Sequence, residues 1–359
     1  MKHDWRMTTL PDPAHPVATT GGHEPATAQP PVHLLPLRIG SLSLSTPLLM
    51  APMAGYSDLP FRRLVREQGG LGLAFTEMLN PNCVIRKKSK RAREILATAT
   101  DDQPLGYQLY GTDPTLMREA AIALEAQGAV LIDINMGCPQ RKISSRGAGA
   151  GLLRTPDSAL ALAAAVCQSV HIPVTVKMRL GWDHESHVAA ELTRQMAGIG
   201  IAAVTIHGRT RGQGYMGNAD LDAIGAVVVA GGSMPVIGNG DILTPLDAVR
   251  MLQVTGCAGL MLGRGIMRNP CLMRDTLKYL QGLPPDPAPT LHNCIALALR
   301  HLDGMVALYG PDGGALLFRK WIPFYASGLR LKKPAMVALL QIAGLEKLKA
   351  ALVSHGGLA

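Results

Sequence analysis

Residues 174–179 read Val174-Thr175-Val176-Lys177-Met178-Arg179, a short and largely apolar run with a polar end. Seven more such runs occur, each followed by a longer segment with helical spacing, and the eight runs cover residues 48–53, 72–77, 105–110, 130–135, 174–179, 203–207, 235–238 and 259–262. Continuous runs without a clean alternation of polar and apolar residues are typical of parallel strands covered by helices. Eight strand–helix units within about 230 residues predict an α/β fold of the (β/α)8 class, the TIM barrel.

The composition narrows the class of the protein. Of 359 residues, 47% are apolar and 17% are charged, which excludes a disordered or highly solvated chain. No uninterrupted apolar run approaches the roughly eighteen residues of a membrane span, and the first residues lack the apolar segment of a signal peptide. No run ends in a Gly-x-Gly-x-x-Gly turn, so the main sequence evidence for a dinucleotide-binding doubly wound sheet is missing. We expect a cytoplasmic protein that does not enter a membrane.

Four segments are expected along the chain. Residues 1–33 contain six prolines and four histidines without apolar periodicity, and we interpret them as a disordered tail. The barrel is expected over residues 34–281, and the proline-rich residues 282–289 form a linker. Residues 290–359, with helical periodicity over 291–308 and 316–352, predict a small all-helical domain. It carries eight Lys and Arg against three Asp and Glu, so it is basic.

The net charge of the whole chain is +9, from 35 Lys and Arg against 26 Asp and Glu, which favours a polyanionic partner. Of the six cysteines, none forms a Cys-x-x-Cys pair, and none has a histidine at the spacing of a zinc site. We therefore expect no metal and no disulfide framework. A monomer is the default expectation for the oligomeric state.

The polar residues at the strand ends are candidates for a site, because active sites of TIM barrels lie at the carboxyl ends of the strands. The last two runs end in Asn239-Gly240-Asp241 and Gly263-Arg264-Gly265. Glycines let backbone N–H groups approach an anion, and an arginine adds charge. These two ends therefore predict a phosphate site, with a pair of ordinary turns as the alternative.

Other strand ends indicate redox chemistry beside that phosphate. Lys177 is placed to stabilise the anionic edge of a reduced flavin, and Gln108 to bond the polar face of its ring; a lysine that extends to water is the alternative. His207 also lies at a strand end, although a buried core histidine has the same pattern. Cys138 follows the fourth run on a glycine-containing loop, where a thiol can donate a proton as a general acid. A buried structural thiol is the alternative reading of Cys138.

Two basic clusters indicate nucleic acid. The first, residues 86–93, has six cations in eight residues, among them Arg86, Lys87, Lys88 and Lys90. The second lies in the helical domain, includes Arg319, Lys320, Arg330, Lys332 and Lys333, and is interleaved with Trp321, Phe324 and Tyr325. Cations with aromatic rings bind the backbones and bases of nucleic acids. A solvated charged face is the alternative.

Several of these stretches match a known family in their order along the chain. They are Ala51-Pro52-Met53-Ala54-Gly55-Tyr56-Ser57-Asp58, Asp133-Ile134-Asn135-Met136-Gly137-Cys138-Pro139, Val176-Lys177-Met178-Arg179, His207-Gly208-Arg209-Thr210-Arg211, Asn239-Gly240-Asp241 and Gly263-Arg264-Gly265. Together they resemble the bacterial tRNA-dihydrouridine synthases, from about residue 35 to 330. Arg319-Lys320-Trp321 resembles the signature of that family's helical RNA-binding domain. The resemblance implies an oxidoreductase that contains FMN and uses NADPH to reduce the C5=C6 bond of selected tRNA uridines to 5,6-dihydrouridine.

The resemblance also implies roles for individual residues. The flavin site would contain Pro52, Met53 and Ala54 against the ring, Gln108, Lys177 and His207 at its polar atoms, and Asn239, Gly240, Asp241, Gly263 and Arg264 at the phosphate. Cys138 would donate a proton to C5 of the uracil, and the polar edge of the base would meet Asn135, Arg179 and Arg209. The target base must leave the stack of the tRNA to reach such a site.

Two other functions compete with this one. A dihydroorotate-dehydrogenase-like FMN enzyme would act on a free pyrimidine, but it would need neither the helical domain nor the cluster at residues 86–93. A non-catalytic RNA-binding barrel would have no use for a proton donor such as Cys138. Flavin content and tRNA dependence separate the three functions.

Overall fold

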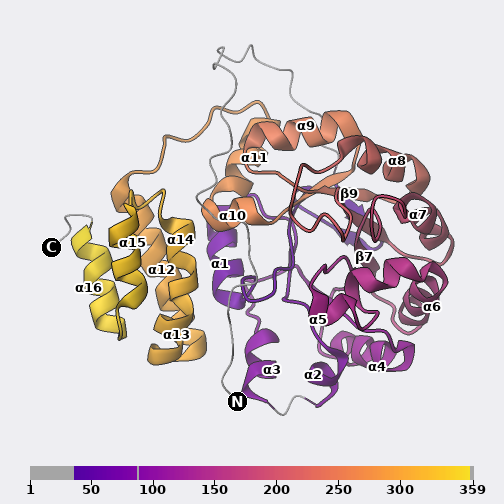
Figure 1. Ribbon diagram of the computed structural model, residues 1–359, viewed down its shortest axis with the longest axis horizontal. Coiled ribbons are helices and arrows are strands. Elements are labelled where there is room, and N and C mark those ends of the chain that lie inside the picture. Colours follow the sequence, from indigo (N-terminus) through magenta and orange to yellow (C-terminus); the bar gives the residue numbers. More distant parts are fainter. Residues whose placement is uncertain (1–35, 87–88, 356–359) are drawn as a thin grey trace.

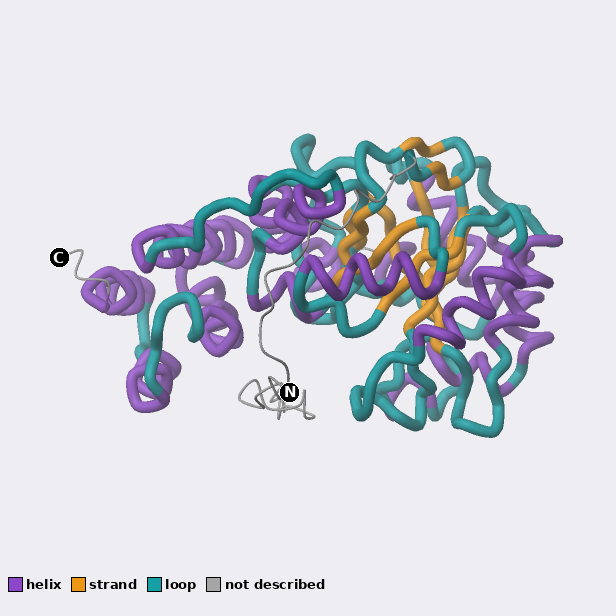
Figure 2. The backbone as a smooth tube through the Cα atoms, turned by 90° about the horizontal axis from the view of Figure 1, so that it is seen from above, coloured by secondary structure: helices purple, strands orange, loops and turns teal. Residues whose placement is uncertain are grey.

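A computed structural model of the chain describes residues 36–86 and 89–355 (Figure 1). A barrel of strands and helices lies beside a group of helices formed by the last part of the chain (Figures 1 and 2). The expected tail, residues 1–33, lies outside the described residues, and so do Lys87 and Lys88 of the first basic cluster.

Eight parallel strands form one sheet in the order β3-β10-β9-β8-β7-β6-β5-β4. They are β3 (Leu48–Met50), β4 (Ala74–Phe75), β5 (Leu105–Leu109), β6 (Leu131–Met136), β7 (Val174–Arg179), β8 (Ala203–His207), β9 (Val236–Asn239) and β10 (Gly259–Leu262). A parallel bridge between Leu49 and Leu73 joins the two edges of the sheet, so the strands close into a barrel. Each strand overlaps one of the eight predicted runs, and the predicted (β/α)8 fold is confirmed.

Strands β6 and β7 alternate between apolar and polar residues, so the expectation of continuous runs without clean alternation was wrong for these two strands. In β6 and β7 the outward side chains, Ile132, Ile134, Met136, Val174, Val176 and Met178, belong to the core beneath the helices. The inward side chains become polar toward the carboxyl ends, where Asp133 and Lys177 lie. The outer face meets the apolar faces of helices, whereas the upper inner face contacts no helix and is left for polar groups.

An apolar floor closes the amino-terminal end of the barrel. It is covered by an antiparallel hairpin of β1 (Arg38–Ile39) and β2 (Leu42–Ser43). Leu37 and Ile39 from this segment pack with the inward-facing Leu131 and Met261, and all four side chains are at most 3% exposed. The polar end of the barrel interior is therefore the opposite, carboxyl end, as in other barrels of this class.

Helices surround the barrel, as Figure 1 shows. They are α1 (Leu59–Gln68), α2 (Pro81–Arg86), α3 (Lys90–Ile95), α4 (Pro114–Glu125), α5 (Arg141–Ser144), α6 (Pro156–Cys167), α7 (Ala189–Gly198), α8 (Leu221–Gly231), α9 (Pro245–Thr255), α10 (Arg264–Arg268) and α11 (Leu272–Leu280), with one 3-10 segment, η1 (Gly149–Arg154). The carboxylates of Asp58, Asp113 and Asp220 accept backbone N–H groups at the starts of α1, α4 and α8. These caps satisfy donors that the first turn of a helix leaves without partners, and so they mark where each helix begins.

The last part of the chain is helical, but more divided than expected. It contains α12 (Leu291–Tyr309), α13 (Pro311–Phe318), η2 (Arg319–Trp321), α14 (Ile322–Tyr325), α15 (Lys333–Gln341) and α16 (Leu345–His355). The helix expected over 291–308 is α12, whereas the stretch 316–352 is broken at several points. Pro323 and Pro334 each lie in the first turn of a new helix, and Arg330 and Gly344 have positive φ angles of 53° and 89°. Within residues 36–86 and 89–355, no helix is long and apolar enough to cross a membrane.

An aromatic core joins the helical part to the barrel. Trp321 is fully buried, and its ring centroid lies 4.4 Å from that of Phe61 in α1 and 4.6 Å from that of His301 in α12. Tyr325 is 4% exposed and contacts His301. Trp321 and Tyr325 therefore form the interior between the two parts, and their rings are not on the surface beside the neighbouring cations.

Candidate active site

Polar side chains from four neighbouring strands meet at the carboxyl end of the barrel interior. The strand register pairs Asn135 of β6 with Lys177 of β7, Arg179 of β7 with His207 of β8, and His207 with Asn239 of β9. Neighbouring strands in a sheet lie about 5 Å apart, so these five predicted site residues are brought together.

A chain of amide hydrogen bonds supports the loop after β6. Gln108 Nε2 donates to Asp133 Oδ2 at 2.6 Å, and Asn135 Nδ2 donates to Gln108 Oε1 at 2.8 Å. Asn135 Oδ1 in turn accepts the backbone N–H of Cys138 at 2.9 Å. Gln108 is 1% exposed, and both ends of its amide bind within the protein. The bonds therefore fix the position of Asn135 and, through it, of the loop that carries Cys138.

The thiol of Cys138 lies half-buried on that loop. A Cβ atom at Gly149 would lie 3.0 Å from Cys138 Cβ, so η1 packs closely behind the cysteine. Burial raises the pKa of the Cys138 thiol, although the backbone N–H of Gln140 and the charges of Arg179 and Lys177 act in the opposite direction. The thiol is therefore protonated at neutral pH and can act as an acid.

Lys177 extends across the mouth of the barrel toward β9. Its Nζ donates to Asn239 Oδ1 at 3.0 Å, and Asn239 Nδ2 donates to the carbonyl of Met261 in β10 at 2.7 Å. Burial and the nearby charge of Arg179 lower the pKa of Lys177 to about 8, while Asp133 acts in the opposite direction. The lysine is thus a charged donor at neutral pH that loses its proton more readily than an exposed lysine.

The two predicted substrate-binding arginines, Arg179 and Arg209, hold the loop after β8. Arg179 donates to the carbonyls of Gly137, Thr210 and Gly214, and Arg209 donates to those of Met216 and Gly217. Both side chains are almost completely buried, at 3% and 2% exposure. Their many backbone partners show that they shape the mouth of the barrel from within.

An ion pair between Asp241 and Arg264 connects the ends of β9 and β10. Asp241 accepts from Arg209 at 2.6 Å, from Arg264 at 2.9 Å and from the backbone N–H of Ala219 at 2.8 Å. Gly240 has a φ angle of 127°, and a Cβ atom there would lie 2.8 Å from Ala219 Cβ. Only glycine fits this turn, which packs directly against Ala219 and the ring of His207.

The mouth of the barrel holds more cations than carboxylates. Lys177, Arg179, Arg209 and Arg264 lie there with the carboxylates of Asp133 and Asp241. Burial lowers the pKa of His207 well below 6.5, and these four cations lower it further, so the histidine is neutral at pH 7. Burial likewise lowers the pKa of Arg179 to about 10. The chemistry of this donor set suits an anionic ligand, since an anion would neutralise the surplus positive charge.

The loop after β3 forms the other side of the mouth. Pro52 and Met53 are half-buried and Ala54 is exposed. The next residue, Gly55, donates its N–H to Glu77 Oε2 at 2.7 Å and accepts a hydrogen bond from Lys320 Nζ. A residue of the helical part thus holds a loop of the barrel mouth.

The predicted nucleic-acid-binding cations differ in their exposure. Arg86 and Lys90 are exposed on α2 and α3, and Lys332 and Lys333 are exposed before and in α15. Lys320 differs, because its ammonium group is turned to Gly55 and lies near Asp58 and Glu77, whose charges raise its pKa against the larger effect of burial. The ammonium group of Lys320 is therefore engaged within the protein, and its role at a nucleic-acid backbone stays a prediction. Arg319, half-buried, lies beside it in η2.

Comparison with known proteins adds to this geometry. The family model described as dihydrouridine synthase matches residues 49–353. The chain belongs to the dihydrouridine synthase family. It is 40% identical over 290 residues to a probable tRNA-dihydrouridine synthase of Rhodobacter capsulatus, a match that covers 81% of this chain and 89% of the relative. It is 37% identical to tRNA-dihydrouridine synthase B of Pseudomonas putida over 80% of this chain and 85% of that one.

Solved structures share the barrel of this dihydrouridine synthase family member. Histamine dehydrogenase from Rhizobium sp. 4-9 aligns with a TM-score of 0.53 and 14% identity, over 75% of this chain and 50% of that one. Morphinone reductase in complex with tetrahydroNAD aligns with a TM-score of 0.50 and 13% identity, over 72% of this chain and 93% of that one. At such low identity, these likenesses concern the fold alone.

Two residues of the candidate site, Asp133 and Tyr215, were not among the expected ones. Asp133, whose pKa burial raises to about 6, accepts from Gln108 and Thr175 at the base of the amide chain. An aspartate inside an apolar strand was the signal for it. Tyr215 lies beneath the guanidinium groups of Arg179 and Arg264, 5.6 Å and 5.0 Å from its ring centroid, and no local pattern marks it.

Proposed function

We propose that this member of the dihydrouridine synthase family reduces uridines of tRNA to 5,6-dihydrouridine, with FMN as the bound cofactor and NADPH as the reductant. The observation that carries the proposal is the placement of a protonated thiol, Cys138, on a fixed loop beside the cationic mouth of the barrel. General acids act on a reacting atom from such positions.

The residues of the barrel mouth suit FMN. Asn239, Gly240, Asp241, Gly263 and Arg264 would hold its phosphate, because a glycine turn and a guanidinium lie where β9 and β10 end. Lys177 would donate to the polar edge of the ring, and His207, neutral at pH 7, would lie beside it. Pro52, Met53 and Ala54 would pack against the ring face. Bound FMN would supply the hydride for C6 of the uracil.

The chain itself would supply the proton and the position of the base. The Cys138 thiol would donate its proton to C5 of the uracil, and Asn135 would bind the polar edge of the base. We assign Gln108 to positioning Asn135, rather than to contact with the flavin, because both ends of its amide already bind Asp133 and Asn135. Arg179 and Arg209 would position the loop of residues 208–217 around the base.

The tRNA would contact cations of the two basic clusters. Arg86 and Lys90, together with Lys87 and Lys88, would bind backbone phosphates, as would Lys332, Lys333 and Arg319 of the helical part. These contacts would offset the cost of extruding the base, which is on the order of a few kcal/mol. We infer a barrel domain over residues 34–281, a linker over 282–289 and a tRNA-binding domain over 290–359.

Mass spectrometry of tRNA tests the proposal. Unmodified tRNA is incubated with the purified protein and NADPH, and its nucleosides are analysed for dihydrouridine. New dihydrouridine is expected. An FMN-containing protein that forms none would point to a free pyrimidine as the substrate, whereas a protein with neither product nor flavin would be a binding barrel. Replacing NADPH by NADH in the same assay tests the reductant.

Charge reversal of the first basic cluster gives a second test. Arg86→Glu with Lys90→Glu is expected to weaken tRNA binding and to reduce the slope of log K against log[salt] by about 1.5, since each phosphate contact contributes about 0.7–0.9. NADPH oxidation without tRNA should be unchanged. The matched control reverses Arg194 and Arg250, which are exposed on α7 and α9. Equal slopes in the two double variants would show that the cluster is a solvated face.

The affinity for FMN should depend on pH through Lys177. Its pKa in the cofactor-free protein is lowered to about 8 by burial and by Arg179, and the negative charge of FMN favours its protonated form. Above that pKa the free protein must take up a proton to bind, so affinity should be level below about pH 8 and fall as the pH rises further. Quenching of FMN fluorescence between about pH 7 and 10 measures this. Lys177→Met should bind more weakly and lose the inflection; an inflection that persists in this variant would assign it to another group.

A further inference from the structure

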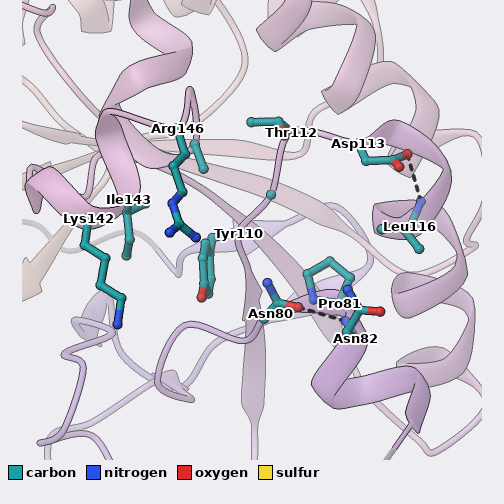
Figure 3. Close-up of a pocket in the computed structure, with 12 residues that line it drawn as sticks. Asn80, Pro81, Asn82, Tyr110, Thr112, Asp113, Leu116, Lys142, Ile143 and Arg146 are labelled. Atoms are coloured by element: carbon teal, nitrogen blue, oxygen red, sulfur yellow. Dashed lines mark hydrogen bonds between the residues drawn. The ribbon is translucent and has the colours of Figure 1, made fainter.

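A cavity of about 390 Å³ lies beside the barrel mouth and is not used by the reaction described above (Figure 3). It lies between the loops that follow β4, β5 and β6. Its volume falls in the range of about 300–1,000 Å³ that is typical of sites for small ligands. Lining residues that matter here are Asn80, Asn82, Tyr110, Lys142, Ile143 and Arg146.

One wall of this cavity is formed by residues that follow Cys138 in the chain and pack against it. Ile143 lines the cavity, and its Cγ2 would lie 3.2 Å from a Cβ atom at Gly149, the same point that would lie 3.0 Å from Cys138 Cβ. Ala148 also lines the cavity, and Ala150 donates its N–H to the carbonyl of Cys138 at 3.1 Å. A ligand in the cavity is therefore separated from the cysteine by one layer of residues.

The cavity combines an aromatic ring with two cations. Figure 3 shows the side chains of Tyr110, Lys142 and Arg146 extending in the same direction, with Asn80 and Asn82 across from the cations. Lys142 and Arg146 are exposed, lie four residues apart around α5, and form no ion pair within the described part of the chain. The carboxylate of Asp113 is engaged, since it accepts the N–H groups of Thr115 and Leu116. The charge of the cavity is therefore positive.

We propose that this cavity binds the nucleotide next to the reduced uridine, with its base against Tyr110 and its phosphate at Lys142 and Arg146. An aromatic face with a nearby cation is the chemistry that binds single-stranded nucleotides irrespective of sequence. This inference rests on the proposed function, because it assumes that an RNA strand enters the barrel mouth. It adds a second fixed point on that strand, which would keep the extruded uridine from rotating away from Cys138.

The position of the cavity favours RNA over the reductant as the source of the nucleotide. Asn80, Pro81 and Asn82 line the cavity near the start of α2, and α2 ends at Arg86, the first residue of the first basic cluster, which is exposed. Figure 1 shows α2, α3 and α5 at one side of the barrel, and the cavity is lined by residues of α2 and α5. A backbone that binds the cluster would continue into the cavity before it reaches the thiol.

The test measures binding of an unmodified tRNA transcript by fluorescence anisotropy, with FMN-loaded protein that carries Cys138→Ala so that nothing is turned over. Tyr110→Leu is expected to weaken binding about tenfold, because base stacking on an aromatic ring is lost, whereas Tyr110→Phe keeps the ring and should bind as the parent does. Arg146→Glu is expected to weaken binding and lower the salt slope by about 0.7 or more. Arg250→Glu, exposed on α9, is the matched control for charge.

Two further measurements separate the outcomes. NADPH oxidation without tRNA should be unchanged in Tyr110→Leu and Arg146→Glu made in the otherwise wild-type protein. A raised KM for NADPH with unchanged tRNA affinity would assign the cavity to the reductant and overturn the proposal. Unchanged affinity in Tyr110→Leu, while the wild-type protein forms dihydrouridine, would refute this site alone. A wild-type protein that neither binds tRNA nor forms dihydrouridine would refute the proposed function and this site with it.

Discussion

Cys138→Ala is expected to lower the rate of dihydrouridine formation by about 10²- to 10⁴-fold, the usual contribution of a positioned general acid, with FMN still bound. The structure gives the reason. Burial keeps the thiol protonated at neutral pH, and the backbone at Cys138 is held by Asn135 rather than by the thiol, so the loop should persist without the sulfur. Single-turnover measurement of dihydrouridine with excess enzyme reports the chemical step directly.

The controls use the other thiols and the flavin. Cys167→Ala removes a thiol whose pKa burial raises to about 11, on the helix that precedes β7, and should leave the rate unchanged. Flavin absorbance and NADPH oxidation without tRNA should be the same in both variants. A wild-type rate in Cys138→Ala would end the assignment of this residue as the proton donor.

Asp102→Asn is expected to destabilise the protein by about 3–5 kcal/mol, since it leaves buried guanidinium groups without a carboxylate. Asp102 accepts from Arg62 at 2.8 Å and from Arg66 at 3.2 Å, and the side chains of Asp102 and Arg62 are fully buried. These bonds connect α1, which contacts α12 of the helical part, with the segment before β5. Loss of the pair therefore affects both parts of the molecule.

The neighbouring residue provides a matched control. Asp101 pairs with Arg63 at 2.7 Å, but their side chains are 53% and 45% exposed, so Asp101→Asn should cost at most about 1 kcal/mol. Urea denaturation followed by circular dichroism, at pH 7 and with FMN in excess, compares the two variants. Equal losses of stability would show that burial does not determine the strength of this ion pair.

The barrel was predictable because its signal is repeated and local. Each of the eight strands lies within or overlaps an apolar run that is followed by a helix, and the connections of a parallel barrel leave few other topologies. The alternation in β6 and β7 was missed because apolar outward residues and polar inward residues were read as one run. The Asp133 and Lys177 side chains that break the runs are the ones that face the interior.

The site was predictable as a set of strand ends, but not in its contacts. Strand order and register place Lys177, His207 and Asn239 together, and both follow from the fold. The partners of Arg179 depend on the path of the loop over residues 208–217, which no periodic pattern describes. Lys320 shows the same limit, because its partner Gly55 lies 265 positions away in the sequence. The basic composition of its segment predicts an exposed lysine, whereas in the fold the ammonium group of Lys320 binds the carbonyl of Gly55.

The surplus of positive charge in the barrel mouth makes the stability of the folded protein depend on an anionic ligand. Without an anion, Lys177, Arg179, Arg209 and Arg264 repel one another, and the folded chain is correspondingly less stable. A ligand that binds only the folded state adds about 2.7 kcal/mol of stability at a concentration of about 100 times its Kd. That gain lowers the unfolded population about a hundredfold, and proteases act on this population. We therefore expect the cellular level of the protein to fall when flavin is scarce.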